Sequence, residues 1–136
     1  MGVLRPYISS TDARSQAQFY AGALGGEIKS VLTYGQAMGS GHDHKDKVMH
    51  LCVHVAGDNA IFMEDALDPI RPGDGISFNV SYRKESEGRA AFLNLAADGE
   101  VKSPYELQPF GIFHGIVKDR YGITWMITAD EPDEKR

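Results

Sequence analysis

The sequence lacks the features that hold secreted and membrane proteins together. Cys52 is the single cysteine among 136 residues, so no disulfide can form within the chain and a disulfide-stapled secreted fold is not indicated. No apolar run approaches the length of a membrane span, and the first residues hold no apolar stretch of signal-peptide length. We therefore expect a cytoplasmic protein with no membrane partner.

Positive charge is also sparse. The chain carries 14 Lys and Arg against 19 Asp and Glu, and no basic cluster is dense enough to follow a phosphate backbone, so we expect no nucleic-acid partner. The sequence shows no Gly-rich phosphate loop, nucleophile elbow, Cys-x-x-Cys pair or methyl-donor cofactor motif. With 42% hydrophobic and 24% charged residues, its composition is that of a globular domain that buries a core without staples.

An internal repeat organises the chain. Residues 17–30 align without gaps with residues 90–103, at a constant offset of 73. The identical pairs are Ala17/Ala90, Phe19/Phe92, Gly26/Gly99, Glu27/Glu100, Lys29/Lys102 and Ser30/Ser103. The alternative is a chance likeness between two helix–Gly–strand segments. Because the same expected elements flank both copies, we interpret the match as two copies of one unit.

Each copy predicts the element order β-α-β-β-β. In the first, Ser10-Thr11-Asp12 supplies N-cap chemistry for a helix that stops at Gly25-Gly26. Strands are expected at 4–9, 27–34, 48–55 and 60–64. The polar, Gly-rich segment 35–47 between them is expected to be a mobile loop.

The second copy has the same plan. Alternation of Phe78 and Val80 with polar residues predicts a strand at 75–82, and Ser81 precedes a helix that Gly99 stops. Further strands are expected from 100–103, at 113–118 and at 123–128, with Trp125 in the core. We predict a single α+β domain, residues 1–136, with unit one at 1–68, a turn-rich linker at 69–74, unit two at 75–130 and a charged tail at 131–136.

Short motifs in a fixed order add a family resemblance. They are Pro6-Tyr7-Ile8, Phe19-Tyr20, Leu24-Gly25-Gly26-Glu27, Met49-His50-Leu51, Gly57-Asp58, Phe62-Met63, Phe110-Gly111, Gly115 and Asp119-Arg120-Tyr121-Gly122-Ile123-Thr124-Trp125. Together they resemble the PhnB-like branch of the vicinal-oxygen-chelate (glyoxalase/bleomycin-resistance protein/dioxygenase) superfamily. The resemblance implies tandem βαβββ units that form a curled mixed sheet around a cavity, commonly in a homodimer. In metal-dependent members, four side chains there hold a divalent ion that acts as a Lewis acid.

The metal-ligand positions implied by the resemblance carry unsuitable residues. They fall at Arg5, Met63, Gly75 or Ile76, and Met126. A one-residue shift would place Glu64 at the second position and leave the others empty. Met thioethers suit neither Mg²⁺ nor Zn²⁺. We therefore expect no metal and no cofactor, with a divalent metal as the disfavoured alternative.

Histidines are the strongest candidates for chemistry. His50, Cys52 and His54 share one face of a strand, and the resemblance favours His50 as an acid/base group. Satisfied polar side chains on a sheet face are the alternative. The residues expected to contact a ligand are His50, Cys52, Met63, Asn79, His114 and Met126. Tyr105 and Phe110 are expected in a loop over the cavity, and Glu64 and Asp65 are either a base or ligand pair or turn residues.

Three functions fit these features. The first is a small-molecule binding protein whose cavity lacks the usual metal site. The second is a metal-dependent or His50-assisted lyase, isomerase or transferase on the same scaffold. The third is a dimeric regulatory module. The residues do not identify a substrate.

Overall fold

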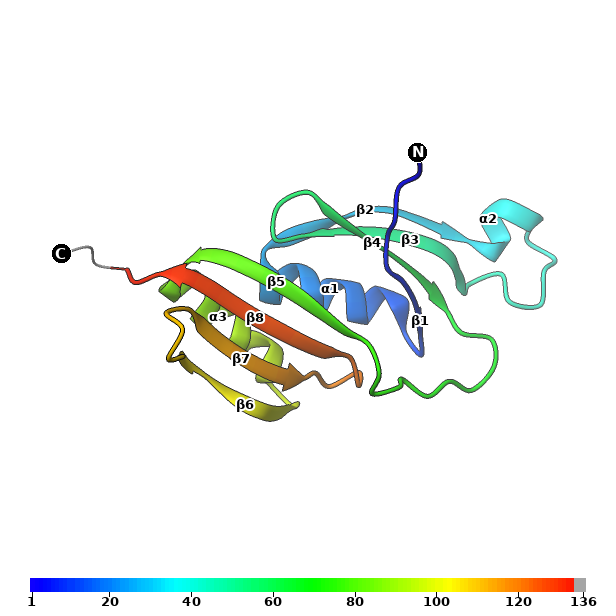
Figure 1. Cartoon of the computed structure of the whole chain (residues 1–136). Coiled ribbons are helices and arrows are strands. Elements are labelled where there is room, and N and C mark those ends of the chain that lie inside the picture. The colour runs from blue at the N-terminus through cyan, green and yellow to red at the C-terminus, as the bar shows by residue number, and fades with distance from the viewer. Residues whose placement is uncertain (134–136) are drawn as a thin grey trace. The chain divides into compact units, whose positions relative to one another are not determined.

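The computed structural model describes residues 1–133 and is shown in Figure 1. The chain divides into two compact units, Met1–Arg71 and Pro72–Arg136, and the division falls inside the segment expected as a linker. Each unit has its own sheet and its own long helix, so each is described by itself. Among the described residues, no helix is long and apolar enough to cross a membrane.

Unit 1 is a four-stranded sheet covered by one long helix. Its elements are β1 (Tyr7–Ser10), α1 (Ala13–Leu24), β2 (Gly26–Thr33), α2 (Tyr34–Met38), β3 (Val48–Val55) and β4 (Asn59–Asp65). The strand order is β1-β4-β3-β2. β1 runs parallel to β4, while β2, β3 and β4 pair in antiparallel fashion, which makes the sheet mixed.

The expected caps set the ends of α1. The Asp12 side chain accepts a hydrogen bond from the Ser15 backbone nitrogen at 3.1 Å, which satisfies one of the unpaired amides of the first turn. Gly25 ends the helix with φ of 79°, a conformation that glycine adopts without strain. The helix buries Ala17 and Tyr20 against the sheet, as an amphipathic helix must.

Unit 2 repeats this plan. Its elements are β5 (Ser77–Lys84), α3 (Glu85–Ala96), β6 (Glu100–Leu107), β7 (Phe113–Lys118) and β8 (Thr124–Glu131). The strand order β5-β8-β7-β6 matches that of unit 1, again with a parallel first pair and two antiparallel pairs. The predicted α+β class with tandem βαβββ units is confirmed, and α2 is an addition in unit 1.

The repeated glycine of the alignment has a structural reason in both copies. A Cβ on Gly26 would overlap the carbonyl oxygen of His54, and one on Gly99 would lie 2.5 Å from the carbonyl oxygen of Lys118. Both glycines therefore let β2 or β6 approach the neighbouring strand. Gly99, the expected helix stop, follows the end of α3 at Ala96, and the residue in the left-handed conformation there is Asp98, with φ of 58°.

Two further details of unit 2 concern β5 and β6. Ser81 lies within β5 and precedes α3, as expected, and its hydroxyl is 2.9 Å from Thr128 Oγ1. α3 begins at Glu85, after an N-cap residue without a side-chain hydrogen bond. Tyr105 lies in β6 rather than in a loop, and its buried ring stacks on Phe113 with centroids 6.0 Å apart.

Segments expected to lack structure contain some. The loop expected at 35–47 begins with α2, where Thr33 and Gln36 form a capping box. The Gly35 backbone nitrogen donates to the Lys45 carbonyl oxygen at 2.8 Å, which ties the two ends of the loop together. In the expected tail at 131–136, β8 extends through Glu131, and residues 134–136 lie outside the described part of the chain.

The core of unit 2 holds the expected tryptophan. Trp125 is fully buried and its Nε1 donates to Asp119 Oδ2 at 2.8 Å. The other Asp119 oxygen accepts from the backbone nitrogens of Tyr121 and Ile123, so one carboxylate organises the β7–β8 turn and fixes the indole.

Candidate functional site

The two faces of the unit 1 sheet have different environments. On β4, Ile61, Met63 and Asp65 are buried, whereas the alternating Ala60, Phe62 and Glu64 are partly exposed. Asp65 Oδ1 accepts from the backbone nitrogen of Ala13, the first residue of α1, so the buried set faces α1. We call the opposite face, turned away from α1, the open face of unit 1.

This division corrects one predicted site residue. Met63 is fully buried on the side of α1, opposite Leu51 and Ile8 in the neighbouring strands. The expectation that Met63 lines a ligand-facing surface is therefore wrong by one residue. Phe62 and Glu64, its chain neighbours, lie on the open face instead.

β3 places the predicted histidines on the open face. Leu51, Val53 and Val55 are buried, and the alternating His50, Cys52 and His54 are partly exposed. Cys52 pairs directly with Phe62 across the β3–β4 ladder. Leu51 pairs with Met63, so His50 and Glu64, the next residues outward, are cross-strand neighbours.

Three rings gather on this face. The His50 and Phe62 centroids are 4.7 Å apart in an edge-on arrangement, and Tyr7 lies 6.0 Å from His50 and 6.3 Å from Phe62. The Arg5 guanidinium carbon lies 5.3 Å from the Phe62 centroid, over the ring, at cation–π distance. These contacts bring residues from both ends of unit 1 into one cluster.

A carboxylate completes the cluster. Glu64 Oε2 accepts a hydrogen bond from Ser9 Oγ at 3.0 Å. The pKa of Tyr7 is raised above its usual value, first by partial burial and then by the negative charge and hydrogen bond of Glu64. We call Arg5, Tyr7, Ser9, His50, Phe62 and Glu64 the aromatic–carboxylate cluster.

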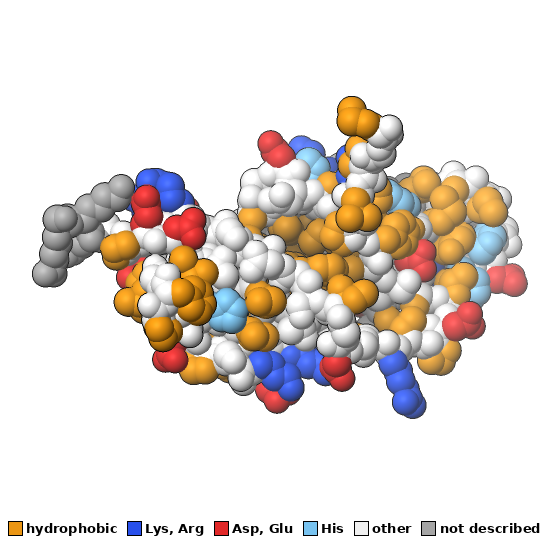
Figure 2. All heavy atoms as spheres, viewed as in Figure 1, with side chains coloured by type: hydrophobic (Ala, Val, Ile, Leu, Met, Phe, Trp, Pro, Cys, Tyr) orange, Lys and Arg blue, Asp and Glu red, His pale blue; other side chains and the backbone are white. Residues whose placement is uncertain are grey.

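The space-filling view shows the surroundings of the segment that leads into β1. In Figure 2, hydrophobic side chains gather around the base of the N-terminal arm that leads into β1. Tyr7 is 51% exposed, which is enough for a bound molecule to contact its ring. The cluster can therefore offer an aromatic surface, an imidazole and a fixed carboxylate to a small molecule.

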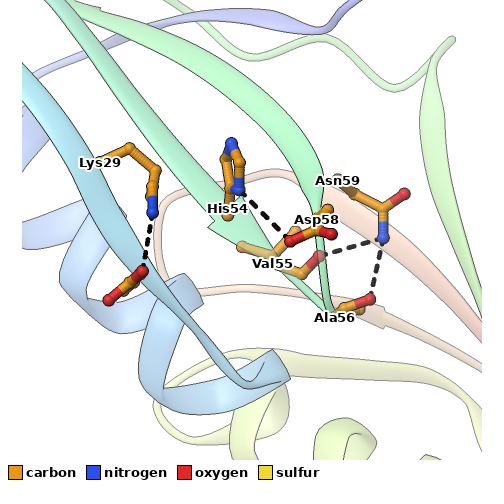
Figure 3. Close-up of polar contacts among 7 residues, drawn as sticks. Lys29, His54, Val55, Ala56, Asp58 and Asn59 are labelled. Atoms are coloured by element: carbon orange, nitrogen blue, oxygen red, sulfur yellow. Dashed lines mark hydrogen bonds and ion pairs between the residues drawn. The ribbon is translucent and has the colours of Figure 1, made fainter.

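His54 belongs to a different set of contacts, at the β3–β4 turn (Figure 3). Its Nδ1 lies 3.8 Å from Asp58 Oδ1, and the Asn59 side chain donates to the carbonyl oxygens of Val55 and Ala56. Lys29, which the same view labels, binds a Glu27 oxygen at 2.9 Å instead. These contacts organise the turn, which separates the surroundings of His54 from those of His50.

The open face of unit 2, the face turned away from α3, carries the other predicted residues. Asn79 pairs with Met126, and His114 pairs with Thr128. Ser81 Oγ donates to Asn79 Oδ1 at 3.1 Å, so this face also has a small polar network. Asn79, His114 and Met126 therefore share one face of one sheet.

The matched strand order shows which positions correspond. The Leu51–Met63 pair of unit 1 corresponds to the Gly115–Ile127 pair of unit 2. One residue before Leu51 and Gly115, His114 therefore corresponds to His50. The same count aligns Met126 with Phe62 rather than with Met63. Sequence reasoning missed Tyr7 and Phe62. Alternation on β4 separates Phe62 from Met63, but only the burial of Met63 opposite Leu51 shows that Phe62 is on the open face.

The donor set does not fit the metal site of metal-dependent relatives. Of the four implied positions, Arg5 is a cation that lies over a ring, and Met63 is buried on the other face of the sheet. Residues 1–133 contain no group of three or more His, Cys, Asp or Glu side chains arranged to hold an ion. Glu64 alone offers a carboxylate at the cluster.

Comparisons with known proteins agree with this architecture. Residues 7–128 match the model of a family described as 3-demethylubiquinone-9 3-methyltransferase. Protein YjdN of Escherichia coli (strain K12) is 27% identical over 139 residues, which cover 93% of this chain and 94% of that protein. The crystal structure of protein PA1353 from Pseudomonas aeruginosa superposes with a TM-score of 0.81 at 28% identity, covering 98% of this chain and 100% of that one.

Two more distant structures bear on the fold alone. One is a putative 3-demethylubiquinone-9 3-methyltransferase, PhnB protein, from Bacillus cereus, with a TM-score of 0.74 at 24% identity and coverage of 94% and 99% of the two chains. The other is a glyoxylase/bleomycin resistance protein/dioxygenase domain from Frankia sp. EAN1pec, with a TM-score of 0.66 at 16% identity and coverage of 96% and 98%. The predicted glyoxalase/bleomycin-resistance fold is confirmed.

Proposed function

The chain belongs to the PhnB-like family described as 3-demethylubiquinone-9 3-methyltransferase, and from this premise we propose that it binds a small molecule at the aromatic–carboxylate cluster of unit 1. The family description names a methyl transfer, but the sequence carries no recognisable methyl-donor motif. Binding is therefore the function that the residues support.

The observation that carries this proposal is the convergence of Tyr7, His50 and Phe62 beside Glu64 on the open face. Aromatic rings supply apolar contact area, and a few fixed polar groups orient a ligand, which is the usual composition of a small-molecule site. The three rings come from β1, β3 and β4, whose ladders hold them at fixed spacing. The strands therefore preorganise the surface before any ligand arrives.

A ligand screen with matched variants tests the proposal. The wild-type chain is screened against a broad small-molecule panel by thermal shift, because a molecule that binds only the folded state raises the melting temperature. For each hit, His50→Ala is expected to weaken binding at least tenfold. His54→Ala, on the same strand and face but in the β3–β4 turn contacts, is expected to change it less than twofold. Equal losses in the two variants would contradict the proposal.

The predicted contacts on unit 2 stay part of this proposal. Asn79→Ala, His114→Ala and Met126→Ala are measured against the same hits. A loss of affinity in them would show that the open face of unit 2 also contributes to binding. Cys52, next to Phe62 in the ladder, is tested as Cys52→Ser.

A second candidate function is proton transfer on the bound molecule. The cross-strand placement of His50 and Glu64 favours it, because an imidazole beside a carboxylate can exchange a proton with a substrate. If a hit is turned over by the wild type, and both His50→Gln and Glu64→Gln still bind it but no longer turn it over, an isomerase or lyase would be supported. Turnover that survives both changes would exclude this pair as the acid and base.

A homodimer is also proposed. The family resemblance implies it, and on unit 2 the apolar side chains of Phe110, 70% exposed, and Leu107, 59% exposed, are available for a second copy to cover. Light scattering at micromolar concentration should give twice the chain mass. A mass of one chain at every concentration would contradict the dimer and the regulatory module that depends on it.

A further inference from the structure

We propose that the ligand of the aromatic–carboxylate cluster carries an organic cation, an amidinium, guanidinium or alkylammonium group, which binds where the Arg5 guanidinium now lies. This inference rests on the proposed binding function and names its ligand class. It is carried by one juxtaposition: the Phe62 ring, which already holds a cation over its face, and the Glu64 carboxylate two residues along the same strand.

Arg5 shows that the Phe62 face accepts a cation. The guanidinium carbon lies 5.3 Å from the ring centroid, at a distance where the ring quadrupole attracts positive charge. The Arg5 side chain is exposed and precedes β1, while the adjoining backbone is held separately by a hydrogen bond from the Phe62 nitrogen to the Pro6 carbonyl oxygen at 3.0 Å. A ligand cation can therefore replace Arg5 without breaking a strand.

The fixed charge of the cluster is negative. Phe62 and Glu64 are two positions apart on β4, so they project from the same face at a separation of about 7 Å. Glu64 is held by Ser9 Oγ at 3.0 Å, and Ser9 lies on β1, the strand paired with β4. A cation over Phe62 thus lies within reach of a carboxylate that is already oriented.

An anionic ligand held by Arg5 and His50 is the competing interpretation. Arg5 contributes the only positive side chain of the cluster's six residues, and it lies outside the strands. Glu64, which is anchored between two strands, would repel an anion at the same place. The formal net charge of −5 adds a weak field of the same sign. The arrangement therefore favours a cation.

Three molecules of nearly the same shape but different charge separate these interpretations. Benzamidinium is a planar cation, benzamide is its neutral analogue and benzoate is the corresponding anion. Each is titrated into the full chain at neutral pH, and amide NMR signals are followed. We expect benzamidinium to shift signals of β1 and β4 around Tyr7 and Phe62, with an affinity at least fivefold above that of benzamide. Benzoate is expected to bind more weakly still.

Variants test which residues make the difference. Glu64→Gln keeps the shape but removes the charge, and should weaken benzamidinium binding at least fivefold while leaving benzamide unchanged. Arg5→Gln removes the guanidinium that competes for the Phe62 ring and should strengthen benzamidinium binding about twofold or more. The matched control is Glu106→Gln, which removes a carboxylate opposite His114 on unit 2 and should have no effect. Circular dichroism checks that each variant is folded.

The outcomes separate this inference from the function on which it rests. If benzoate binds as well as benzamidinium, or if Glu64→Gln does not alter the preference, the cation proposal is overturned. If the broad panel still yields hits that depend on His50, the proposed binding function stands without it. If the panel also yields none, both proposals fail.

Discussion

Removing the side chain of Asp65, which follows Glu64 but lies on the buried face of β4, should destabilise unit 1 strongly. Its two oxygens accept hydrogen bonds from the backbone nitrogens of Ala13 at 2.8 Å and Val48 at 2.7 Å. The first bond serves the start of α1 and the second the start of β3. One carboxylate thereby joins three elements in a buried place, and Ala at position 65 would leave both amides without partners.

The magnitude follows from the two orphaned groups. A buried donor that loses its partner costs about 1–3 kcal/mol, and Ala13 and Val48 are both almost fully buried. Two such losses, partly relieved by relaxation of the helix end, give about 3 kcal/mol for Asp65→Ala. Asp65→Asn keeps one acceptor but presents an NH₂ group to the other amide, so its cost should be smaller but still above about 1 kcal/mol.

Urea unfolding followed by circular dichroism measures these changes. For Asp65→Ala the midpoint should fall by about 1–2 M at unchanged slope. The matched control is Glu64→Ala, one residue away on the open face, which should change stability by less than about 1 kcal/mol because its partners can bond to water. An equal or smaller loss for Asp65→Ala than for Glu64→Ala would refute the assignment of the two faces.

Three further predictions concern other features of unit 1. Gly26→Ala should cost about 2 kcal/mol or more, because its Cβ meets a backbone carbonyl of β3, whereas Gly41→Ala, with no atom within 4 Å, should be nearly neutral in the same melts. Asp12→Ala should remove about 1 kcal/mol of helix capping at neutral pH. Hydrogen bonds from Ser15 lower the pKa of Asp12 in the folded state below its usual 3.8. The capping contribution of Asp12 is therefore fully present above pH 3.8. As the pH falls through the lowered pKa, the difference in stability between Asp12→Ala and wild type should disappear. Glu64→Gln should bring the raised pKa of Tyr7 partly back toward 10.0 in an NMR titration, since burial, the largest cause, remains; an unchanged pKa would show that the two side chains do not interact.

Much of the fold could be predicted from the sequence, because the repeat, the alternation of strand residues and the helix caps are properties of residues close together in the chain. The 73-residue repeat predicted two units with the same element order, and the strands at 48–55 and 113–118 have the observed bounds. Alternation placed His50, Cys52 and His54 on one strand face. Helix starts and stops were predicted where a side chain or glycine acts within its own turn, as at Asp12 and Gly25.

Local signals failed where a distant segment decided the outcome. Tyr105 is expected in a loop, but its ring stacks on Phe113 of the neighbouring strand, and β6 continues past it. Gly99 resembles a helix stop, yet its lack of a side chain serves the approach to Lys118. On β4, alternation separates Met63 from Phe62 and Glu64, but it does not say which set α1 covers.

The sequence by itself determined the duplicated βαβββ plan, the family and the candidate histidine, because periodicity and motif order are properties of neighbouring residues. Only the tertiary structure decided which side of each strand is covered, because burial depends on the helix that packs there. That decision moved the proposed site from Met63 to Phe62 and Glu64, and the parallel pairing of β1 with β4 added Tyr7 and Ser9. Residues 55 positions apart in the chain, such as Ser9 and Glu64, come into contact only through that pairing.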